Sequence, residues 1–317
     1  MNRANNPQSA DGVLVIDKPA DWTSHDVVAK VRKILRTRRV GHTGTLDPFA
    51  TGVLVVCVNR ATRLVQYLTG DDKEYVATMR LGFATDTGDF TGEALSPITD
   101  ASQITSEQVR EALNQFRGRI RQIPPMYSAK KIGGVRLHEL ARRGEEIERQ
   151  PIEIEIKELE LLPNSQVLDS HAGSVRTQEF SFRVVCTAGT YVRTLTEDIG
   201  KRLGVGAHLI SLRRTRAGSS RLTEAVTLEQ LSELVEQGRL AEVLTQMADA
   251  VELPEMILSE EECKAVGHGR SIRRTGTWQA GSLSKLCDGE RNLLAIAEFN
   301  AENSVWRPRA VLAEQPN

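Results

Sequence analysis

The 317 residues are 40% hydrophobic and 26% charged, as in ordinary globular proteins, and their number favours a large domain followed by a smaller one. The longest apolar run, residues 52–58, is too short for a membrane span, and the polar start argues against a signal peptide. The 4 cysteines are scattered and form no CxxC pair, which argues against a disulfide framework and a thiolate metal site. We therefore expect a cytoplasmic protein, and its net charge of −1 indicates no general affinity for nucleic acid.

Basic residues are nevertheless concentrated in two stretches. The first contains Lys30, Arg32, Lys33, Arg36, Arg38 and Arg39. The second contains Lys130, Lys131, Arg136, Arg142 and Arg143. Acidic stretches such as residues 146–160 balance them in the total, so the net charge hides two candidate sites for an anionic partner.

In the first half of the chain, strands are the main elements expected. Apolar or alternating runs predict them at residues 13–16, 53–58 and 75–82. An amphipathic, basic helix is predicted after the candidate caps Thr23 and Ser24, because apolar residues recur at helical spacing as far as Leu35. A glycine-rich turn, residues 41–52 (GHTGTLDPFATG), follows that helix.

In the second half, helices and strands alternate less regularly. Helices are predicted at residues 106–116, 228–235 and 240–247, and after the candidate cap Thr190. Strands are predicted at residues 152–156, 179–187 and 208–215. Residues 117–148 form a long basic connection, which we interpret as a functional insertion. Beyond Pro254, glycine, tryptophan and short apolar runs indicate a compact β-rich module.

Asp47 is the most informative ionisable residue, because it lies inside the glycine-rich turn. Glycines allow the backbone to pass close to a ligand, and Pro48 restricts the preceding residue to extended dihedral angles. The Asp47 side chain is therefore expected to project in one direction. Asp-Pro is also a common turn signal, so these residues alone leave a purely structural role open.

Four blocks together resemble the tRNA pseudouridine-55 synthases of the TruB type: GVLVIDKP, GHTGTLDPFATGVL, KEYVATMRLG followed by TDTGD, and GTYVRTL. The match is ordered and extends from about Gly12 to about Arg214. It implies isomerisation of uridine to pseudouridine at position 55 in the T loop of tRNA, through base flipping. That reaction breaks the bond from base to sugar and rejoins the uracil through carbon without net redox change, so no cofactor is chemically necessary.

The resemblance also implies the catalytic residues. Asp47 matches the essential carboxylate, which acts as a nucleophile or stabilises charge at the sugar. Tyr75 matches the active-site tyrosine, which stacks on the extruded base and takes part in proton transfer, and Arg193 matches the arginine that pairs with the aspartate. Without the resemblance, Tyr75 reads as a cross-strand aromatic residue and Arg193 as half of a structural ion pair.

The remaining candidates are substrate-binding residues. Asp89 is expected as a second partner of Arg193, and Tyr191 as part of the pocket lining. His42 matches a histidine that enters the space left by the flipped nucleotide; no HxxxH or HExxH spacing indicates a metal site. Lys18 is expected to support the catalytic loop or the RNA backbone, and Leu209 to form an apolar pocket wall.

The expected fold is α+β. It consists of a disordered tail over residues 1–11, a pseudouridine synthase domain over residues 12–250 and a small PUA-like RNA-binding domain over residues 251–317. The synthase domain has a central mixed, mainly antiparallel sheet and an RNA-binding insertion at about residues 117–150. The PUA-like domain is expected to touch the acceptor arm, although a structural role is an alternative.

The partner implied is tRNA, bound through its T arm by a monomer that needs no obligatory protein partner. One alternative is a relative that uses guide RNAs and partner proteins to modify ribosomal RNA; the long basic insertion favours a stand-alone enzyme. The other alternative, which can coexist with modification, is a tRNA-folding chaperone.

Overall fold

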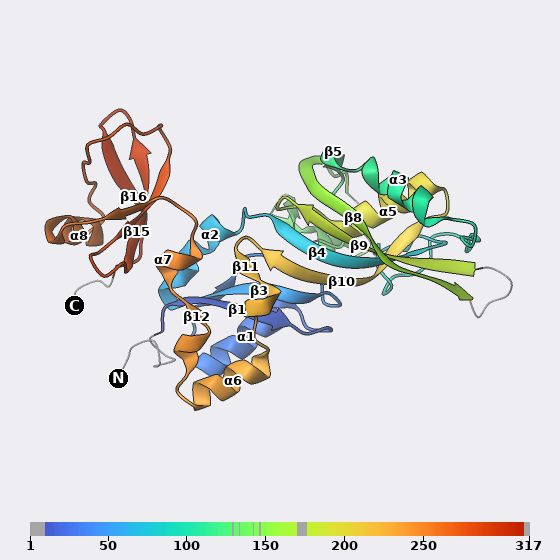
Figure 1. Cartoon of the computed structure of the whole chain (residues 1–317), viewed down its shortest axis with the longest axis horizontal. Coiled ribbons are helices and arrows are strands. Elements are labelled where there is room, and N and C mark those ends of the chain that lie inside the picture. The colour runs from blue at the N-terminus through green and yellow to red at the C-terminus, as the bar shows by residue number, and fades with distance from the viewer. Residues whose placement is uncertain are drawn as a thin grey trace.

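The structure is a computed structural model that describes residues 10–313 except residues 129, 133, 142, 146 and 170–175. Within these residues one large mixed sheet runs through the molecule in the order β12-β1-β3-β10-β4-β9-β8-β5, with β2 beside β3 and β11 beside β10 (Figure 1). Its strands are β1 (Gly12–Lys18), β2 (Val40–His42), β3 (Thr51–Val58), β4 (Lys73–Leu81), β5 (Gly118–Gln122), β8 (Ile152–Asp169), β9 (Arg176–Cys186), β10 (Ala207–Ala217), β11 (Ser220–Arg221) and β12 (Leu244–Thr245). Only the β10–β3 pair among them is parallel, so the expectation of a mixed, mainly antiparallel sheet is confirmed.

Helices cover both faces of this sheet. They are α1 (Ser24–Leu35), α2 (Val65–Leu68), α3 (Ser106–Asn114), α5 (Val192–Leu203), α6 (Leu228–Glu236) and α7 (Met247–Ala250), together with the 3₁₀ turns η2 (Asn59–Leu64), η3 (Leu222–Glu224) and η4 (Leu240–Glu242). Helices α1 and α6 pack on the face that carries Leu14 and Ile16, whereas Val13 and Val15 face α2 and α7. The alternation along β1 therefore decides which cluster each side chain joins.

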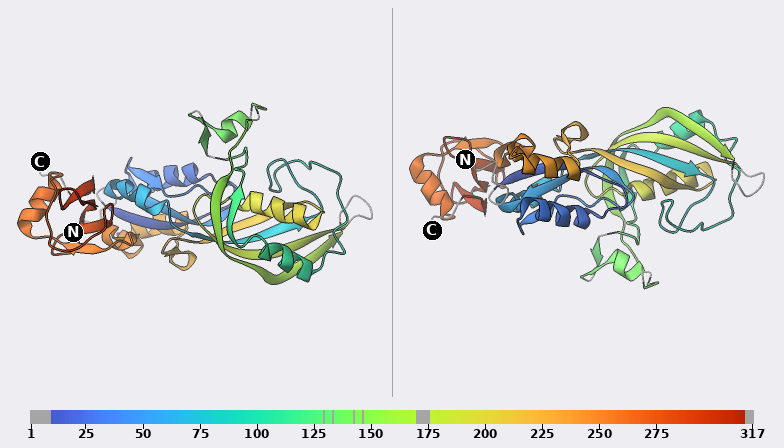
Figure 2. Two further views of the ribbon diagram at one scale, coloured as in Figure 1. Left: turned by 90° about the horizontal axis from the view of Figure 1, so that it is seen from above. Right: turned by 90° about the horizontal axis from the view of Figure 1, so that it is seen from below.

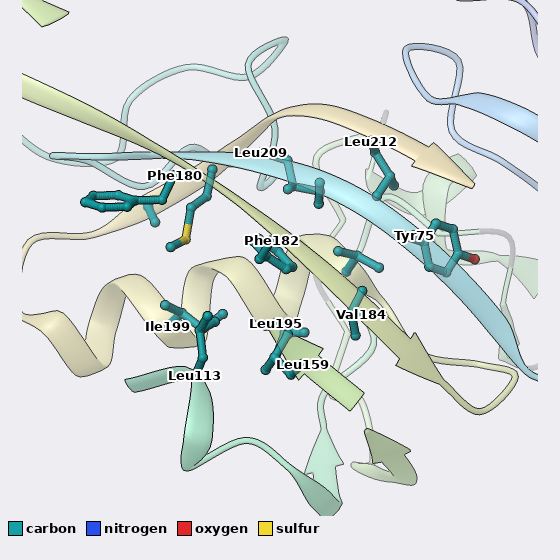
Figure 3. Close-up of a cluster of buried hydrophobic side chains, with 14 of the residues drawn as sticks. Tyr75, Leu113, Leu159, Phe180, Phe182, Val184, Leu195, Ile199, Leu209 and Leu212 are labelled. Atoms are coloured by element: carbon teal, nitrogen blue, oxygen red, sulfur yellow. The ribbon is translucent and has the colours of Figure 1, made fainter. Parts of the chain in front are cut away.

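A separate apolar cluster lies where β4, β8, β9 and β10 pack against α3 and α5 (Figure 3). Phe180 and Phe182 from β9 lie there beside Leu195 and Ile199 from α5. The helical residues are spaced by four, which places them on one face of α5. This packing fixes the start of α5, where two of the expected site residues lie.

The C-terminal module has its own sheet, in the order β13-β14-β15-β16, and one helix. These elements are β13 (Glu255–Ile257), β14 (Leu283–Cys287), β15 (Leu293–Asn300), β16 (Val305–Val311) and α8 (Glu260–Gly267). The chain leaves the large sheet after Thr245 and enters the small one at Glu255, an interval that contains the expected boundary near residue 251. A β-rich module after Pro254 is confirmed.

A projecting segment follows β5 and contains the hairpin of β6 (Lys131–Ile132) and β7 (Val135–Arg136) and the short helix α4 (Leu137–Ala141). Figure 2 shows this segment on the same side of the molecule as α1 and the long loop between β4 and α3. The insertion was expected from about residue 117, but residues 118–122 pair with β8 as the edge strand of the large sheet. The strand could not be predicted from the sequence, because its residues GRIRQ are mostly polar and lack the apolar pattern of a buried strand.

Other sequence-based expectations are confirmed or corrected by the structure. Helices predicted at residues 106–116 and 228–235 are present as α3 and α6. The helix predicted at residues 240–247 is wrong: Leu244 and Thr245 instead pair with β1, and that strand pairing outweighs their helical pattern. Thr190 does not cap α5, since the N-cap is Tyr191 and the Thr190 hydroxyl donates to the Thr187 carbonyl at 2.9 Å.

The expected N-terminal tail lies mostly outside the described residues. Its last two residues are described and are packed. Ala10 is buried, and the Asp11 carboxylate accepts hydrogen bonds from the backbone and the guanidinium of Arg60, both at 2.8 Å. The tail therefore ends at least two residues earlier than residue 11.

Candidate active site

The turn that carries Asp47 joins β2 to β3 and is held at several points. The Ser24 hydroxyl accepts a hydrogen bond from the Leu46 N–H at 2.9 Å, which ties the turn to the first residue of α1. The Ala50 N–H donates to the Asp47 carbonyl at 3.1 Å and closes the turn. Gly52 has a φ of +100°, and a Cβ there would lie 2.2 Å from the Arg214 carbonyl oxygen. Only glycine fits this close approach without displacing β10.

Asp47 and Arg193 form a two-pronged ion pair. The Arg193 Nε donates to one carboxylate oxygen at 2.9 Å and an NH2 nitrogen to the other at 3.0 Å. Arg193 is the second residue of α5 and is only 5% exposed, whereas the Asp47 side chain retains 32% of its accessible surface. This geometry orients the carboxylate by its arginine partner and leaves it accessible from one side.

The remaining Arg193 donors bind backbone oxygens of two other segments. One NH1 donates to the Thr87 carbonyl at 2.8 Å, and an NH2 donates to the Tyr127 carbonyl at 2.7 Å. Tyr127 belongs to the projecting segment after β5. A single guanidinium therefore connects the turn that carries Asp47, the loop after β4 and the root of the projecting segment.

Asp89 lies at the second edge of Arg193, as the sequence suggested, but at 3.8 Å from NH1. Its carboxylate accepts hydrogen bonds from the Thr87 hydroxyl at 2.9 Å and the Thr91 N–H at 3.0 Å. Asp89 is buried and holds the loop that presents the Thr87 carbonyl. Asp89 therefore supports Arg193 and this loop, and it is not among the residues that line the cavity in front of Asp47.

The pKa of Asp47 is raised above its usual value because the carboxyl group is desolvated, and the adjacent Arg193 charge opposes this shift. The neighbouring Asp89 adds a smaller upward effect. The balance leaves a carboxylate whose ionisation depends on the arginine beside it.

Asp47 faces a cavity of about 250 Å3. Its lining includes Tyr75, Lys130, Tyr191, Leu212 and Arg214. A volume of this size suits one nucleobase with part of its sugar, and two tyrosine rings beside a carboxylate suit stacking and proton transfer. A larger cavity of about 550 Å3 is lined by carboxylates that include Asp71, Glu224 and Glu242, a lining that disfavours a phosphate ligand.

Tyr75 lies in β4 opposite Arg214 of β10 and is 9% exposed. Burial raises the pKa of its hydroxyl, and the Arg214 charge opposes that shift. Tyr191 precedes α5, and its backbone exchanges hydrogen bonds with the Gln122 side-chain amide at 3.1 and 3.3 Å. Both tyrosines therefore line the cavity with fixed backbones, where the sequence-based expectation located them.

Lys18 is fully buried beneath the turn. Its ammonium group donates to the carbonyls of Pro19, Trp22 and Pro48 at 2.8, 2.6 and 2.9 Å. Desolvation lowers its pKa to about 8, partly offset by the charge of Asp47. Because Pro48 directly follows Asp47, the Lys18 ammonium group is tied to the turn that carries Asp47, and its hydrogen bonds are with protein carbonyls.

His42 ends β2, next to Thr43 and Gly44 in the cavity wall. Its Nδ1 accepts a hydrogen bond from the Gly44 N–H at 3.3 Å, and its ring meets that of His25 edge-on at 5.6 Å. Desolvation and the nearby His25 and Arg214 lower its pKa, which favours the neutral ring. A neutral, half-buried imidazole at the rim suits stacking on RNA better than an ionic contact.

Leu209 does not form the pocket wall expected from the sequence. It is fully buried in the apolar cluster of Figure 3, and Leu212 lines the cavity instead. Leu209 lies opposite Met79 of β4, four residues along that strand from Tyr75, and the register shift between Leu209 and Ser211 turns Leu212 to the same face of the sheet as Tyr75.

Arg214 was not recognised from the sequence as a site residue. It is 2% exposed, its Nε donates to the Val53 carbonyl at 2.6 Å, and NH2 donates to the Gly44 carbonyl at 3.1 Å. It therefore clamps both ends of the turn that carries Asp47. Strict alternation from Leu209, the residue singled out on this strand, would place Arg214 on the opposite face, so no signal in the sequence pointed to it.

Neither a metal site nor a membrane-spanning helix is found among the described residues. There, no group of three or more His, Cys, Asp or Glu side chains is arranged to hold a metal ion. None of the helices described is both long and apolar enough to cross a bilayer.

Two models of known protein families match this chain. A family model for the N-terminal domain of TruB family pseudouridylate synthases matches residues 32–192, and one for the tRNA pseudouridylate synthase B C-terminal domain matches residues 193–262. The chain belongs to the TruB family of pseudouridylate synthases. The four sequence blocks that suggested the TruB type lead to the same family, so that resemblance is confirmed.

Curated relatives agree with this assignment. A tRNA pseudouridine synthase B of Geobacter sulfurreducens is 48% identical over 241 residues, covering 76% of this chain and 75% of the relative. One of Bacillus cereus is 41% identical over 304 residues, covering 95% of this chain and 97% of the relative. The similarity therefore includes the C-terminal module.

Solved structures support the TruB-family fold. A chain of an H/ACA RNP bound to a substrate RNA containing 2′-deoxyuridine is 27% identical, with a TM-score of 0.71 over 98% of this chain and 87% of that one. A chain of a Cbf5-Nop10-Gar1 complex is 28% identical, with a TM-score of 0.71 over 99% of this chain and 88% of that one. The α+β pseudouridine synthase fold expected from the sequence is confirmed.

Proposed function

We propose that this chain isomerises uridine to pseudouridine at position 55 in the T loop of tRNA, with Asp47 as the catalytic carboxylate. The observation that carries the proposal is the Asp47 carboxylate, held on both oxygens by buried Arg193 and open to a cavity lined by Tyr75 and Tyr191. Relatives that match nearly the whole chain are named tRNA pseudouridine synthase B.

In this reaction the bond between the sugar C1′ and the uracil N1 breaks, the ring turns, and a bond forms between C1′ and C5. The hydrogen on C5 leaves as a proton and N1 gains one, so atoms and electrons balance without a redox partner. Asp47 attacks or stabilises the sugar carbon while the base is detached. Tyr75 stacks on the ring and handles the proton, and Arg193 keeps Asp47 ionised and aimed.

Flipping the uridine out of the T loop costs a few kcal/mol, which binding elsewhere offsets. The exposed basic face of α1 and the projecting segment lie on the same side of the molecule and suit phosphate contacts (Figure 2). His42, neutral at the cavity rim, fills the space left by the flipped nucleotide. Arg142 of the basic insertion lies outside the described residues.

The test uses an unmodified tRNA transcript with tritium on C5 of uracil. Purified wild-type protein should release tritium and place pseudouridine at the T-loop position, whereas Asp47→Asn should release none while still binding tRNA. Asp198→Asn is the matched control, because Asp198 pairs with Lys201 on an exposed part of α5. Retained tritium release by Asp47→Asn would reject the catalytic assignment.

We also propose that the chain acts as a monomer, with no guide RNA and no obligatory protein partner. The solved neighbours come from multi-component complexes, but relatives that match most of this chain are bacterial proteins named for action on tRNA. Tritium release from tRNA by the purified protein alone supports stand-alone activity, and release only after addition of guide RNA contradicts it. Refolding of tRNA by Asp47→Asn would reveal a separate chaperone role.

A further inference from the structure

Phe90 presents an aromatic ring to solvent close to the catalytic turn. It is 51% exposed, and among the described residues it belongs to a small group of large apolar side chains left in water. Its ring contacts that of Phe49 edge to face, with centroids 5.6 Å apart and planes at 82°. Phe49 in turn packs on the apolar cluster below the cavity, so it supports Phe90 from the protein side.

The backbone on either side of Phe90 is fixed. The Phe90 N–H donates to the Leu209 carbonyl at 2.8 Å, and the Leu209 N–H donates to the Gly88 carbonyl at 3.0 Å, so the loop adds to the edge of β10. The preceding Asp89 is buried and hydrogen-bonded to Thr87 and Thr91. An exposed ring on such a support loses little further conformational freedom on binding a partner.

The Phe49 and Phe90 rings lie close in the structure to Asp47 and Arg193. Phe49 is two residues from Asp47, and Phe90 follows Asp89, whose carboxylate lies 3.8 Å from Arg193. The cavity of about 250 Å3 has room for one nucleobase with part of its sugar, so the nucleotides that flank the flipped one must rest outside it. The loop that carries Phe90 lies on the same side of the molecule as α1 and the projecting segment (Figure 2).

We propose that Phe90, backed by Phe49, is a stacking site for an unpaired nucleobase adjacent to the target uridine. The inference rests on the proposed function and extends it to a second base. A single flat ring, in a loop on the same side of the molecule as the basic helix α1, suits a base of a polyanion, since aromatic side chains stack on any base. A protein partner would require a larger apolar patch than two rings provide.

The test compares variants on the full-length protein with an RNA hairpin of the T arm. Phe90→Ala removes the ring, Phe90→Leu keeps apolar contact with Phe49 without a ring, and Phe90→Trp restores a stacking surface. Leu95→Ala is the matched control, because Leu95 is 67% exposed in the same loop region. Hairpins carry 2-aminopurine in place of the nucleotide on either side of the target, so that fluorescence reports stacking directly.

Loss of one stacked base weakens binding by at least about fivefold, since such contacts contribute roughly 1–3 kcal/mol. Phe90→Ala and Phe90→Leu should show this increase in Kd and KM, with Phe90→Trp and Leu95→Ala close to wild type and melting temperatures unchanged. The 2-aminopurine signal should change at one flanking position only.

Equal affinity of wild type and Phe90→Ala, or full retention of affinity by Phe90→Leu, would overturn the stacking site. This comparison of affinities does not depend on turnover. A wild-type protein that binds the hairpin but makes no pseudouridine would instead overturn the proposed function.

Discussion

At the scale of single residues, Asp47 is subject to two opposed effects. Desolvation raises the pKa of its carboxyl group above 3.8, and the charge of Arg193 limits that rise. The ionised form is the one that can attack or stabilise the sugar. In the proposed mechanism, Arg193 therefore acts through the protonation state of Asp47 as well as through its position.

The pH dependence of kcat/KM should reflect this arrangement. Activity falls on the acid side as the pH passes down through the raised pKa of Asp47, because the carboxylate is then protonated. Arg193→Gln removes the cation and should move this acid limb to higher pH, in addition to lowering kcat. Arg202→Gln, an exposed change on the same helix, should leave the profile unchanged. Superimposable profiles for wild type and Arg193→Gln would contradict the assignment.

The burial of Lys18 should be visible in how the free energy of unfolding depends on pH. Its pKa falls from 10.5 to about 8 on folding, so the unfolded chain binds more protons between those two pH values. The contribution of Lys18 to the free energy of unfolding should therefore rise with pH over that interval, by about 3 kcal/mol. Chemical denaturation at several pH values should show that the difference in free energy of unfolding between wild type and Lys18→Met changes by this amount over the interval, whereas the difference between wild type and the exposed control Lys33→Met stays constant.

At the scale of elements, the turn between β2 and β3 depends on close backbone packing. Gly52→Ala should destabilise the protein by about 2 kcal/mol or more, because the new Cβ meets the Arg214 carbonyl and φ is +100°. Gly70→Ala is the control, since a Cβ there meets nothing within 4 Å. Denaturant unfolding measures the stability of both variants. Equal unfolding midpoints for Gly52→Ala and Gly70→Ala would contradict this prediction, because they would show that the turn accommodates the added Cβ without loss of stability.

Elements with strong periodicity could be predicted from the sequence. Helix α1, with its Thr23 capping box, and helix α6 follow from apolar spacing and cap residues that act locally. Strands β5 and β12 could not be predicted, because each is short or polar and forms only by pairing with a neighbour remote in sequence. Leu209 was misplaced for a related reason, since a bulge is set by the partner strand.

At the scale of the whole molecule, the C-terminal module shares a buried apolar cluster with the large sheet and its helices. Leu64 and Leu68 belong to the same buried cluster as Ile296 and Leu312, and the Arg60 guanidinium donates to the Leu312 carbonyl at 2.9 Å. A joint apolar core couples the unfolding of the two parts.

Calorimetry should therefore record one cooperative transition for the full chain. Ile296→Ala should lower the stability of that single transition by about 2–5 kcal/mol, because Ile296 is fully buried. Glu302→Ala, an exposed change in the same module, should have little effect. Two separate transitions, with only one affected by Ile296→Ala, would show that the module folds independently.

The sequence by itself determined the family, the class of fold and the identity of Asp47, Tyr75 and Arg193 as residues to examine, because motifs and periodicity are local. Only the tertiary structure decided that Arg214 clamps the turn and that Arg193, besides pairing with Asp47, also donates to the Thr87 and Tyr127 carbonyls. The physical reason is that these contacts depend on β10 lying between β3 and β4, and neighbouring strands are chosen by the packing of the whole sheet.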